Sequence, residues 1–549
     1  MKKNLAARNL LVLFLTLTFV FPSFVAAQMA ATATRAKSPA MKAAENITAK
    51  QMSDYLYFIA SDEMEGRDTP SRGLDTTAKF IGMNLSRWGF KPAGDNGTYY
   101  QKIALLRESS DAQNSSLNVG GEAFKYGEDF YRLTGSSQSR ISAPIVYGGD
   151  GWFIKAQGID ALQNVDARGK IVVLHSADVV QRNLSGRRGT DWIDPLAYAR
   201  QKGAVGIIMV ASNNIQQDWE IVAKTPAVPR PFVEKFRTAE APLPTIVVSQ
   251  KVGDMLFADP SKAPYRITDE MLKNSSTVSA LNTDKSVSFN AAIKSERVFT
   301  QNVVAIWEGS DPVLKTEMVA VGAHYDHVGM NPNAKGDDKI WNGADDDGSG
   351  TTAILSMAEA LAKSAKRPKR SVLFVWHCGE EKGLWGSQYF TSFPTVALDK
   401  IVAQLNIDMI GRTKKVGDAN VKNAELSGEK EVYVIGSKMM STQLGALSEK
   451  VNNSFLKLNY NYRYDDPTDK NGFFFHSDHF NYAHKGIPII FWFDGVHEDY
   501  HQPGDEPQKI DYNKMQMVTR TVFLTMWELA DLKQRPKVDK QLPPELMRR

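Results

Sequence analysis

The fold is decided by the stretch Asn342-Gly343-Ala344-Asp345-Asp346-Asp347-Gly348-Ser349-Gly350. Its three carboxylates stand between glycines, directly before a helix-like segment at residues 351–363. Further polar clusters follow apolar, strand-like runs elsewhere in the chain: Gly322 to His327, His377 to Glu381, Asn406 to Met409 and Asp499 to His501. Doubly wound α/β sheets present their ligands at the carboxyl ends of the strands. The pattern therefore predicts an α/β fold with a mostly parallel, doubly wound sheet and helices on both faces.

The residue types in these clusters indicate metal chemistry. Eight of the nine histidines lie between His324 and His501, among the carboxylate motifs. Imidazole nitrogen and carboxylate oxygen suit zinc, and a carboxylate can bridge two ions. Glu380 and Glu381 end an apolar strand, where two adjacent charges are costly unless a cation or a proton joins them. We therefore predict a dizinc hydrolase site, in which Asp326 orients the imidazole of His324 from the second shell of the metal.

A calcium site is the alternative for the acidic loop. Asp345, Asp347, Ser349 and Gly350 match the opening of an EF-hand. The twelfth position is Ser356 instead of a bidentate glutamate, and a helix begins inside the loop, so the calcium interpretation fails.

The first residues have the pattern of a secretory signal peptide. Lys2, Lys3 and Arg8 precede an apolar run, and Val25-Ala26-Ala27 is a small-residue cleavage site. We expect residues 1–27 to be removed and the protein to be exported, to the periplasm or the extracellular space. Residues 28–45 are expected to form a disordered lead-in. No later stretch is long and apolar enough to span a bilayer, so no stable membrane anchor is expected.

Composition excludes several partner classes. The 549 residues carry a formal charge of +4, of which the signal peptide holds +3, so nothing favours nucleic acid or an anionic membrane surface. Cys378 is the single cysteine, so an intrachain disulfide is impossible. Its thiol is either a structural core group or a redox-sensitive neighbour of the site. The oligomeric state stays open.

Residues 46–118 are expected to form the N-terminal part of the catalytic domain. Thr48-Ala49-Lys50-Gln51 has the form of a capping box and predicts a helix start. A second helix is predicted over residues 76–88. The polar segment between them, residues 61–67, is either a solvated loop or part of the rim of the active site.

Residues 119–285 have a different texture, with short β-rich runs and no cluster of metal-ligand residues. Strands are expected at 143–147, 170–175, 205–211 and 245–249, with a helix at 194–202. The order of Arg168 to Val173, Ala199 to Ile208 and Leu243 to Val248 resembles a protease-associated (PA) domain. The resemblance implies a lid or substrate-access module without chemistry of its own.

Residues 286–534 return to a regular α/β pattern, followed by a Pro- and charge-rich tail at 535–549. Five stretches here resemble the co-catalytic dizinc aminopeptidases, metallopeptidase family 28: Gly322–Gly329, Asn342–Gly350, Gly379–Gly386, Asn406–Arg412 and Tyr500–Asp505.

The resemblance implies two Zn²⁺ per chain and assigns their ligands. His324, Asp346 and Asp408 would hold one ion, and Asp346, Glu381 and His501 the other, with Asp346 bridging. It further implies that Glu380 is the general base, that Tyr500 stabilises the tetrahedral intermediate, and that the peptide bond after Asp346 is cis. Asp347 departs from the family pattern, because an asparagine is common at that position.

The expected function is that of an exported zinc-dependent exopeptidase acting on peptides, above all an aminopeptidase. The alternatives are a carboxypeptidase of the glutamate carboxypeptidase type, a glutaminyl cyclase, and an inactive receptor-like binding protein of the same fold. A carboxypeptidase needs cations that hold the substrate carboxylate, for which Arg412 is one candidate. The intact set of metal-ligand residues argues against the receptor-like protein.

Overall fold

The structure, a computed structural model, describes residues 37–175, 184, 186–224, 231–237, 242–259, 286–466 and 468–542. The predicted signal peptide lies outside the described residues. The chain divides into two compact units, of which unit 2 is Ile103–Phe299 and unit 1 contains the described residues before and after it. The expected segment 119–285 lies inside unit 2, which also includes parts of β2 (Tyr100–Ser110) and β16 (Ile293–Trp307).

Unit 1 is built on a sheet that is parallel at its centre. Its strands follow the order β16 (Ile293–Trp307), β20 (Ser371–His377), β17 (Met318–His324), β21 (Ile401–Ile407), β24 (Ile489–Phe493), β22 (Glu431–Ile435) and β23 (Asn459–Asn461). The four strands from β20 to β24 are parallel to one another, whereas β16 and β22 join them antiparallel. The predicted doubly wound α/β fold is confirmed, with antiparallel strands added at both sides.

The three strands at the centre of this sheet are buried along their whole length, as a sheet covered on both faces requires. In β17, His324 is in register with His377 of β20, and Gly322 is in register with Asn406 of β21. The carboxyl ends of β17, β20 and β21 therefore lie at one edge of the sheet, where the polar clusters of the sequence follow.

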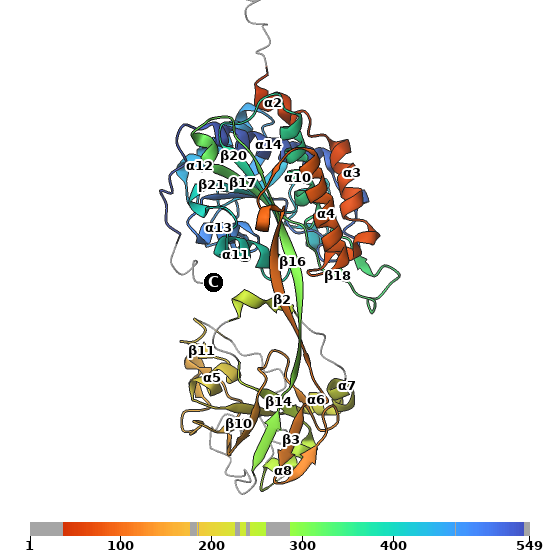
Figure 1. Cartoon of the computed structure of the whole chain (residues 1–549), viewed down its shortest axis with the longest axis vertical. Helices are drawn as coiled ribbons and strands as arrows, with labels where there is room; N and C mark the ends of the chain where they lie inside the picture. The colour runs from red at the N-terminus through yellow and green to blue at the C-terminus, as the bar shows by residue number, and fades with distance from the viewer. Residues whose placement is uncertain are drawn as a thin grey trace, which may run out of the picture. The chain divides into compact units, whose positions relative to one another are not determined.

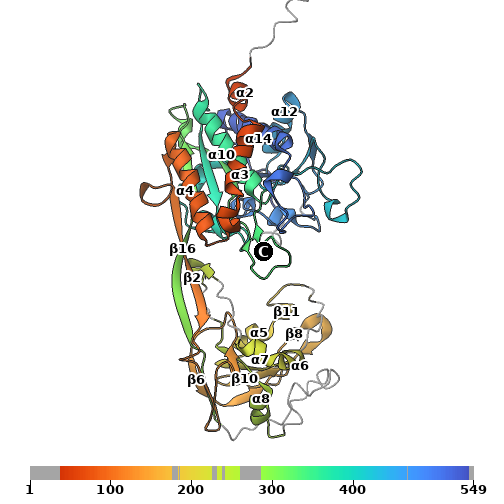
Figure 2. The ribbon, with the colours of Figure 1, turned by 90° about the vertical axis from the view of Figure 1, so that its right-hand side faces the viewer.

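Helices pack on both sides of these strands. Helices α10 (Gly348–Lys363) and α14 (Tyr512–Asp531) contact β17, while α11 (Trp385–Ser392) contacts β20 and α13 (His479–His484) contacts β21 and β24. Figure 1 shows α14 on one side of the central strands and α11 and α13 on the other. Helices α3 (Ala49–Ile59) and α4 (Arg72–Arg87) lie beside α10 (Figure 2), so the N-terminal segment completes this layer.

Helix caps explain where the N-terminal helices begin. Thr48 caps α3 through the predicted capping box with Gln51. Ser71 caps α4, which therefore starts at Arg72, four residues before the predicted start. Part of the expected disordered lead-in is wrong, because α2 (Pro39–Ala44) is a helix with Ser38 as its cap. Ala40, Ala43 and Ala44 are buried, and α2 packs against α10 and α14. The composition of the segment did not indicate this packing.

Unit 2 contains the strands expected for the inserted segment. One of its sheets has the order β5 (Phe130–Arg132), β14 (Thr245–Val248), β12 (Gly206–Val210), β10 (Ile171–His175) and β7 (Ile145–Tyr147), parallel except for β5. Helix α5 (Pro195–Gln201) begins after the cap Asp194. His175 is buried, and its Nδ1 lies 3.1 Å from the hydroxyl oxygen of Tyr147. This contact indicates a structural role for His175. Among the described residues, no helix is long and apolar enough to cross a membrane.

Candidate metal centre

The sheet brings the predicted donor residues to one edge. His324 is the last residue of β17, Glu380 and Glu381 follow β20, and Asp408 is the residue after β21. Because these strands are adjacent and parallel, their ends converge there. Asp346 arrives on the loop before α10, and His501 on the loop after β24.

The first expected triad is assembled. His324 Nε2 lies 3.3 Å from Asp346 Oδ1 and 3.5 Å from Asp408 Oδ1. All three side chains are buried or nearly so. Their donor atoms lie within 4.8 Å of one another, which is the arrangement that one metal ion requires.

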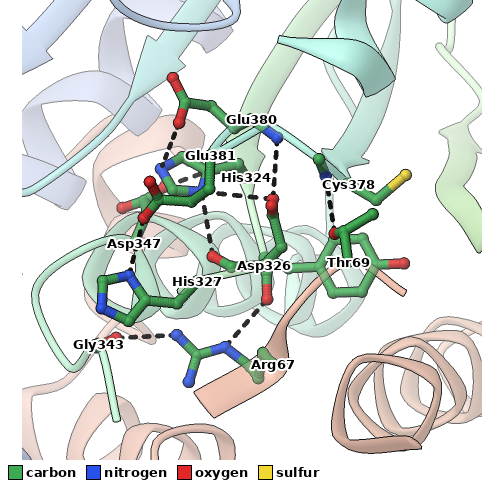
Figure 3. A network of polar contacts seen from close by, with 12 residues as sticks. Arg67, Thr69, His324, Asp326, His327, Gly343, Asp347, Cys378, Glu380 and Glu381 are labelled. Carbon is green, nitrogen blue, oxygen red and sulfur yellow. Dashed lines mark hydrogen bonds and ion pairs between the residues drawn. The ribbon is translucent and has the colours of Figure 1, made fainter. Parts of the chain in front are cut away.

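The second expected triad is assembled beside it, with one more imidazole. His501 Nε2 lies 3.0 Å from Asp346 Oδ2 and 3.1 Å from Glu381 Oε2. His327, which has no role in the sequence-based assignment, places Nδ1 2.9 Å from Glu381 Oε1 and 3.6 Å from Asp346 Oδ2 (Figure 3). Asp346 thus turns one carboxylate oxygen to each group, as a bridging ligand would.

The donor set fits zinc. It consists of imidazole nitrogens and carboxylate oxygens, which are ordinary zinc ligands. Several of these buried atoms have no hydrogen-bond partner in the part of the chain that the structure describes: Asp346 Oδ2, Glu381 Oε1, His327 Nδ1 and His501 Nε2. Buried polar atoms are seldom left without partners, and a shared cation satisfies all four at once. The assignment of individual residues as ligands stays a prediction.

The electrostatics of the site also favour cations. Burial, together with the carboxylates of Asp408, Asp478 and Glu381, raises the pKa of Glu380 well above its usual range. Burial lowers the pKa of His501, but the neighbouring carboxylates of Asp346 and Glu381 outweigh it and raise that pKa to about 10. The His501 shift therefore reflects the negative charge of its neighbours, which divalent ions would neutralise.

The acidic loop is held by backbone hydrogen bonds. Asp505 Oδ2 accepts from the backbone N–H groups of Asp345 and Asp346, at 3.0 and 3.1 Å. Asp347 accepts from the backbone N–H groups of His324, Gly350 and Met409. Asp347 therefore ties the loop to β17 and to the end of β21, a role that its sequence position did not reveal. The Asp346–Asp347 peptide bond is cis, which confirms that prediction.

Asp326 lies where an orienting residue should. His324 Nδ1 is 3.2 Å from the Asp326 carbonyl oxygen and 3.6 Å from its carboxylate Oδ1. The same Oδ1 accepts a hydrogen bond of 3.1 Å from the backbone N–H of Glu380. Asp326 thus contacts the ligand imidazole and the predicted base, and its role as an orienting group stays a prediction.

Arg67 is a buried residue that sequence reasoning missed. It ends the 3₁₀ segment η1 (Asp62–Arg67), inside the loop expected to be solvated or at the rim. Its guanidinium donates to the backbone carbonyl oxygens of Ile59, Tyr325, Asn342 and Gly343, at 2.7 to 2.9 Å. Figure 3 shows the contact with Gly343. Arg67 therefore joins the segment that follows His324 to the loop that carries Asp346. The sole sequence signal was the adjacent pair Gly66-Arg67, which is weak by itself.

Three further residues have defined surroundings. Tyr500, partly exposed, stacks on His501 with ring centroids 4.0 Å apart, so its ring borders the second group. Cys378 is fully buried, and burial raises the pKa of its thiol, which favours the structural interpretation over a redox role. Arg412 is buried and paired with Asp499 at 2.8 Å and with Asp505 at 3.6 Å.

A doubly wound sheet with two adjoining donor groups at its carboxyl edge defines a class, that of the α/β metallohydrolases. Residues 302–526 match the model of peptidase family M28.

Known relatives cover part of the chain. Aminopeptidase Y of Saccharomyces cerevisiae is 32% identical over 177 residues, 31% of this chain and 29% of that protein. Leucine aminopeptidase 2 of Trichophyton equinum is 26% identical over 268 residues, 44% of this chain and 48% of that protein. The chain thus spans about half, or less, of the length of these relatives.

Among solved structures, an aminopeptidase from Aneurinibacillus sp. strain AM-1 aligns with a TM-score of 0.49 and 16% identity, over 92% of this chain and 98% of that one. A zinc aminopeptidase from Bacillus subtilis aligns with a TM-score of 0.45 and 17% identity, over 88% of this chain and 95% of that one.

Proposed function

We propose that the protein is a zinc-dependent exopeptidase, an aminopeptidase that releases N-terminal residues from peptides. The observation that carries the proposal is the pair of donor groups sharing Asp346, with Glu380 beside them. Glu380 Oε2 lies 3.9 Å from His324 Nε2, so the carboxylate borders the first group without belonging to it. The match to the family M28 model and the aminopeptidase relatives support the same activity.

Two zinc ions held by these groups would supply Lewis-acid chemistry for amide hydrolysis. The residues of the chain divide the remaining work. Glu380 takes a proton from the attacking water and returns it to the leaving amine, which is general acid–base catalysis. Asp326 holds the Glu380 backbone and the His324 imidazole in place. Tyr500, partly exposed and stacked on His501, offers its hydroxyl to the oxyanion of the tetrahedral intermediate.

The environment of Arg412 counts against carboxypeptidase action. A substrate carboxylate would need this guanidinium, but Asp499 and Asp505 already neutralise it within the protein. The aminopeptidase relatives favour release of N-terminal residues instead.

The test is peptide hydrolysis with free and blocked N-termini, together with metal analysis. We expect two zinc ions per chain, sequential release of residues from free N-termini, and no cleavage of N-acetylated peptides. A chelator should abolish cleavage and added zinc should restore it. Release of C-terminal residues from N-acetylated peptides would instead establish a carboxypeptidase, and cyclisation of N-terminal glutamine without hydrolysis a cyclase.

We also propose that unit 2 is a PA-like module that governs substrate access. The strands and the helix expected for such a module lie together in this unit, which supports the proposal. A variant in which a short linker replaces Ile103–Phe299 should keep both zinc ions and change the peptide lengths that are cleaved. Loss of zinc with unit 1 still folded would contradict this role.

Export is proposed from the pattern of residues 1–27. N-terminal sequencing of the exported protein should find a start at or near Gln28. Recovery of a membrane-bound form that retains Met1 would contradict it.

A further inference from the structure

The second donor group holds an imidazole that the sequence-based ligand set does not include. His327 is fully buried, and neither of its ring nitrogens makes a hydrogen bond within the residues that the structure describes. Its Nδ1 nevertheless lies 2.9 Å from Glu381 Oε1. This distance is short enough for a hydrogen bond, but the angles at the two atoms are not those of a hydrogen bond. His501 Nε2 likewise lies within 3.1 Å of carboxylate oxygens of Asp346 and Glu381 without a hydrogen bond to either.

The spacing of the four donor atoms matches a single zinc ion. Tetrahedral zinc with bonds of about 2.0–2.1 Å places neighbouring donors about 3.3 Å apart. The distances from His327 Nδ1 and His501 Nε2 to the carboxylate oxygens of Asp346 and Glu381 run from 2.9 to 3.6 Å, with Glu381 turning Oε1 to His327 and Oε2 to His501. A residue that merely packed beside the site would not need to match this spacing on two sides.

The position of the His327 ring is built into the fold. The backbone N–H of His327 donates to the Arg67 carbonyl oxygen at 3.1 Å. Gly343 lies directly against the ring, because a Cβ on Gly343 would come within 2.4 Å of His327 Cγ. Arg67 in turn holds the Gly343 carbonyl oxygen at 2.9 Å (Figure 3). The ring is therefore confined between fixed backbone segments with Nδ1 toward Glu381.

We propose that His327 is a fourth protein ligand of the ion held by Asp346, Glu381 and His501, an inference that rests on the proposed zinc centre. The two sites are then unequal. The second site has four protein donors, like a closed site, whereas His324, Asp346 and Asp408 leave a position open at the first. The ion at the first site should leave before the other when a chelator is added.

A zinc-loaded crystal structure of the full chain tests the ligation directly. We expect His327 Nδ1 at about 2.1 Å from the ion that Glu381 and His501 hold. A separation beyond about 2.8 Å, with a linear hydrogen bond from Nδ1 to Glu381, would overturn the inference and make His327 a group that acts through Glu381.

Zinc affinity in solution provides the second measurement, with His327→Gln and with His377→Gln as the matched control. His377 is equally buried but belongs to neither donor group. In His327→Gln, the affinity of the tighter ion should fall more than ~100-fold, beyond the 10–100-fold typical of groups that act through a ligand. The control should keep both affinities. If the wild type binds two zinc ions and His327→Gln keeps both affinities, the assignment of His327 is wrong and the proposed function stands. If the wild type binds no zinc, both the assignment and the proposed function are wrong.

Discussion

The backbone N–H of Glu380 donates a hydrogen bond of 3.1 Å to the carboxylate of Asp326. The segment after β20 is thereby attached to the segment after β17, which carries the ligand candidate His324. Since the Asp326 carbonyl oxygen is also 3.2 Å from His324 Nδ1, one residue sets the position of a predicted ligand and of the predicted base.

Asp326→Asn should weaken the first zinc site while the fold is kept. The amide retains the size of the carboxylate but removes the charge that orients and polarises His324, a loss that typically costs 10–100-fold in metal affinity. Competition with a chromophoric chelator measures the change. Asp54→Asn, at an exposed position, is the matched control. Equal zinc affinity in Asp326→Asn and the wild type would show that Asp326 does not orient the ligand.

Glu380 and Glu381 should respond differently to substitution. Glu380→Gln removes the proton acceptor alone, so both zinc ions should remain and turnover should fall roughly 10²–10⁴-fold. Glu381→Ala should lose or weaken one zinc ion. Metal analysis must accompany the kinetics, since activity by itself cannot separate the roles. If Glu380→Gln loses zinc and Glu381→Ala keeps both ions, the two assignments are reversed.

Arg67→Met should destabilise unit 1 by at least about 3 kcal/mol, because four buried carbonyl oxygens lose their donor and nearby carboxylates lose a cation. Arg67→Lys should recover little, since an ammonium group cannot reproduce the planar fork. The exposed Arg72→Met serves as the control. Urea unfolding followed by tryptophan fluorescence measures the effect, and an unfolding midpoint equal to that of Arg72→Met would contradict it.

The buried pair Lys514–Asp494 should behave as a unit. Lys514 Nζ lies 3.0 Å from Asp494 Oδ1, and both side chains are fully buried. At pH 8, where Asp494 is ionised, Lys514→Met leaves an uncompensated carboxylate and should cost about 3–5 kcal/mol, whereas Lys514→Met with Asp494→Leu should cost much less. Urea unfolding of both variants checks this. A double variant less stable than Lys514→Met would show that the pair is not coupled.

Asp494 should also contribute a pH dependence. Burial raises its pKa to about 7, with Lys514 opposing the shift and Asp345 reinforcing it. The folded state then binds more protons than the unfolded state between about pH 4 and 7, so this carboxyl group lowers stability as pH rises through that window. The free energy of unfolding of the wild type, relative to Asp494→Asn, should fall by at most about 1.4 kcal/mol per pH unit there. A constant difference between the two proteins from pH 4 to 7 would contradict the raised pKa.

The sequence by itself determined the catalytic fold and the main donor set. Continuous apolar runs such as residues 371–377 and 401–407 are typical of strands buried on both faces, and each is followed at once by polar residues. The parallel order then brings those residues together, so His324, Glu381 and Asp408 could be grouped without coordinates. Thr48 and Gln51 likewise indicated where α3 begins, because a capping box depends only on residues close in the sequence.

Tertiary structure alone decided which other residues join them. His327 is three residues from His324, and alternation along an extended chain predicts that the two side chains diverge. The chain turns after β17, so both imidazoles face Asp346. Arg67 lies 257 positions before His324, in a loop whose composition predicts solvent exposure. Its burial follows from the carbonyl groups of distant segments that converge on its guanidinium, and such long-range convergence leaves no periodic or local signal in a single sequence.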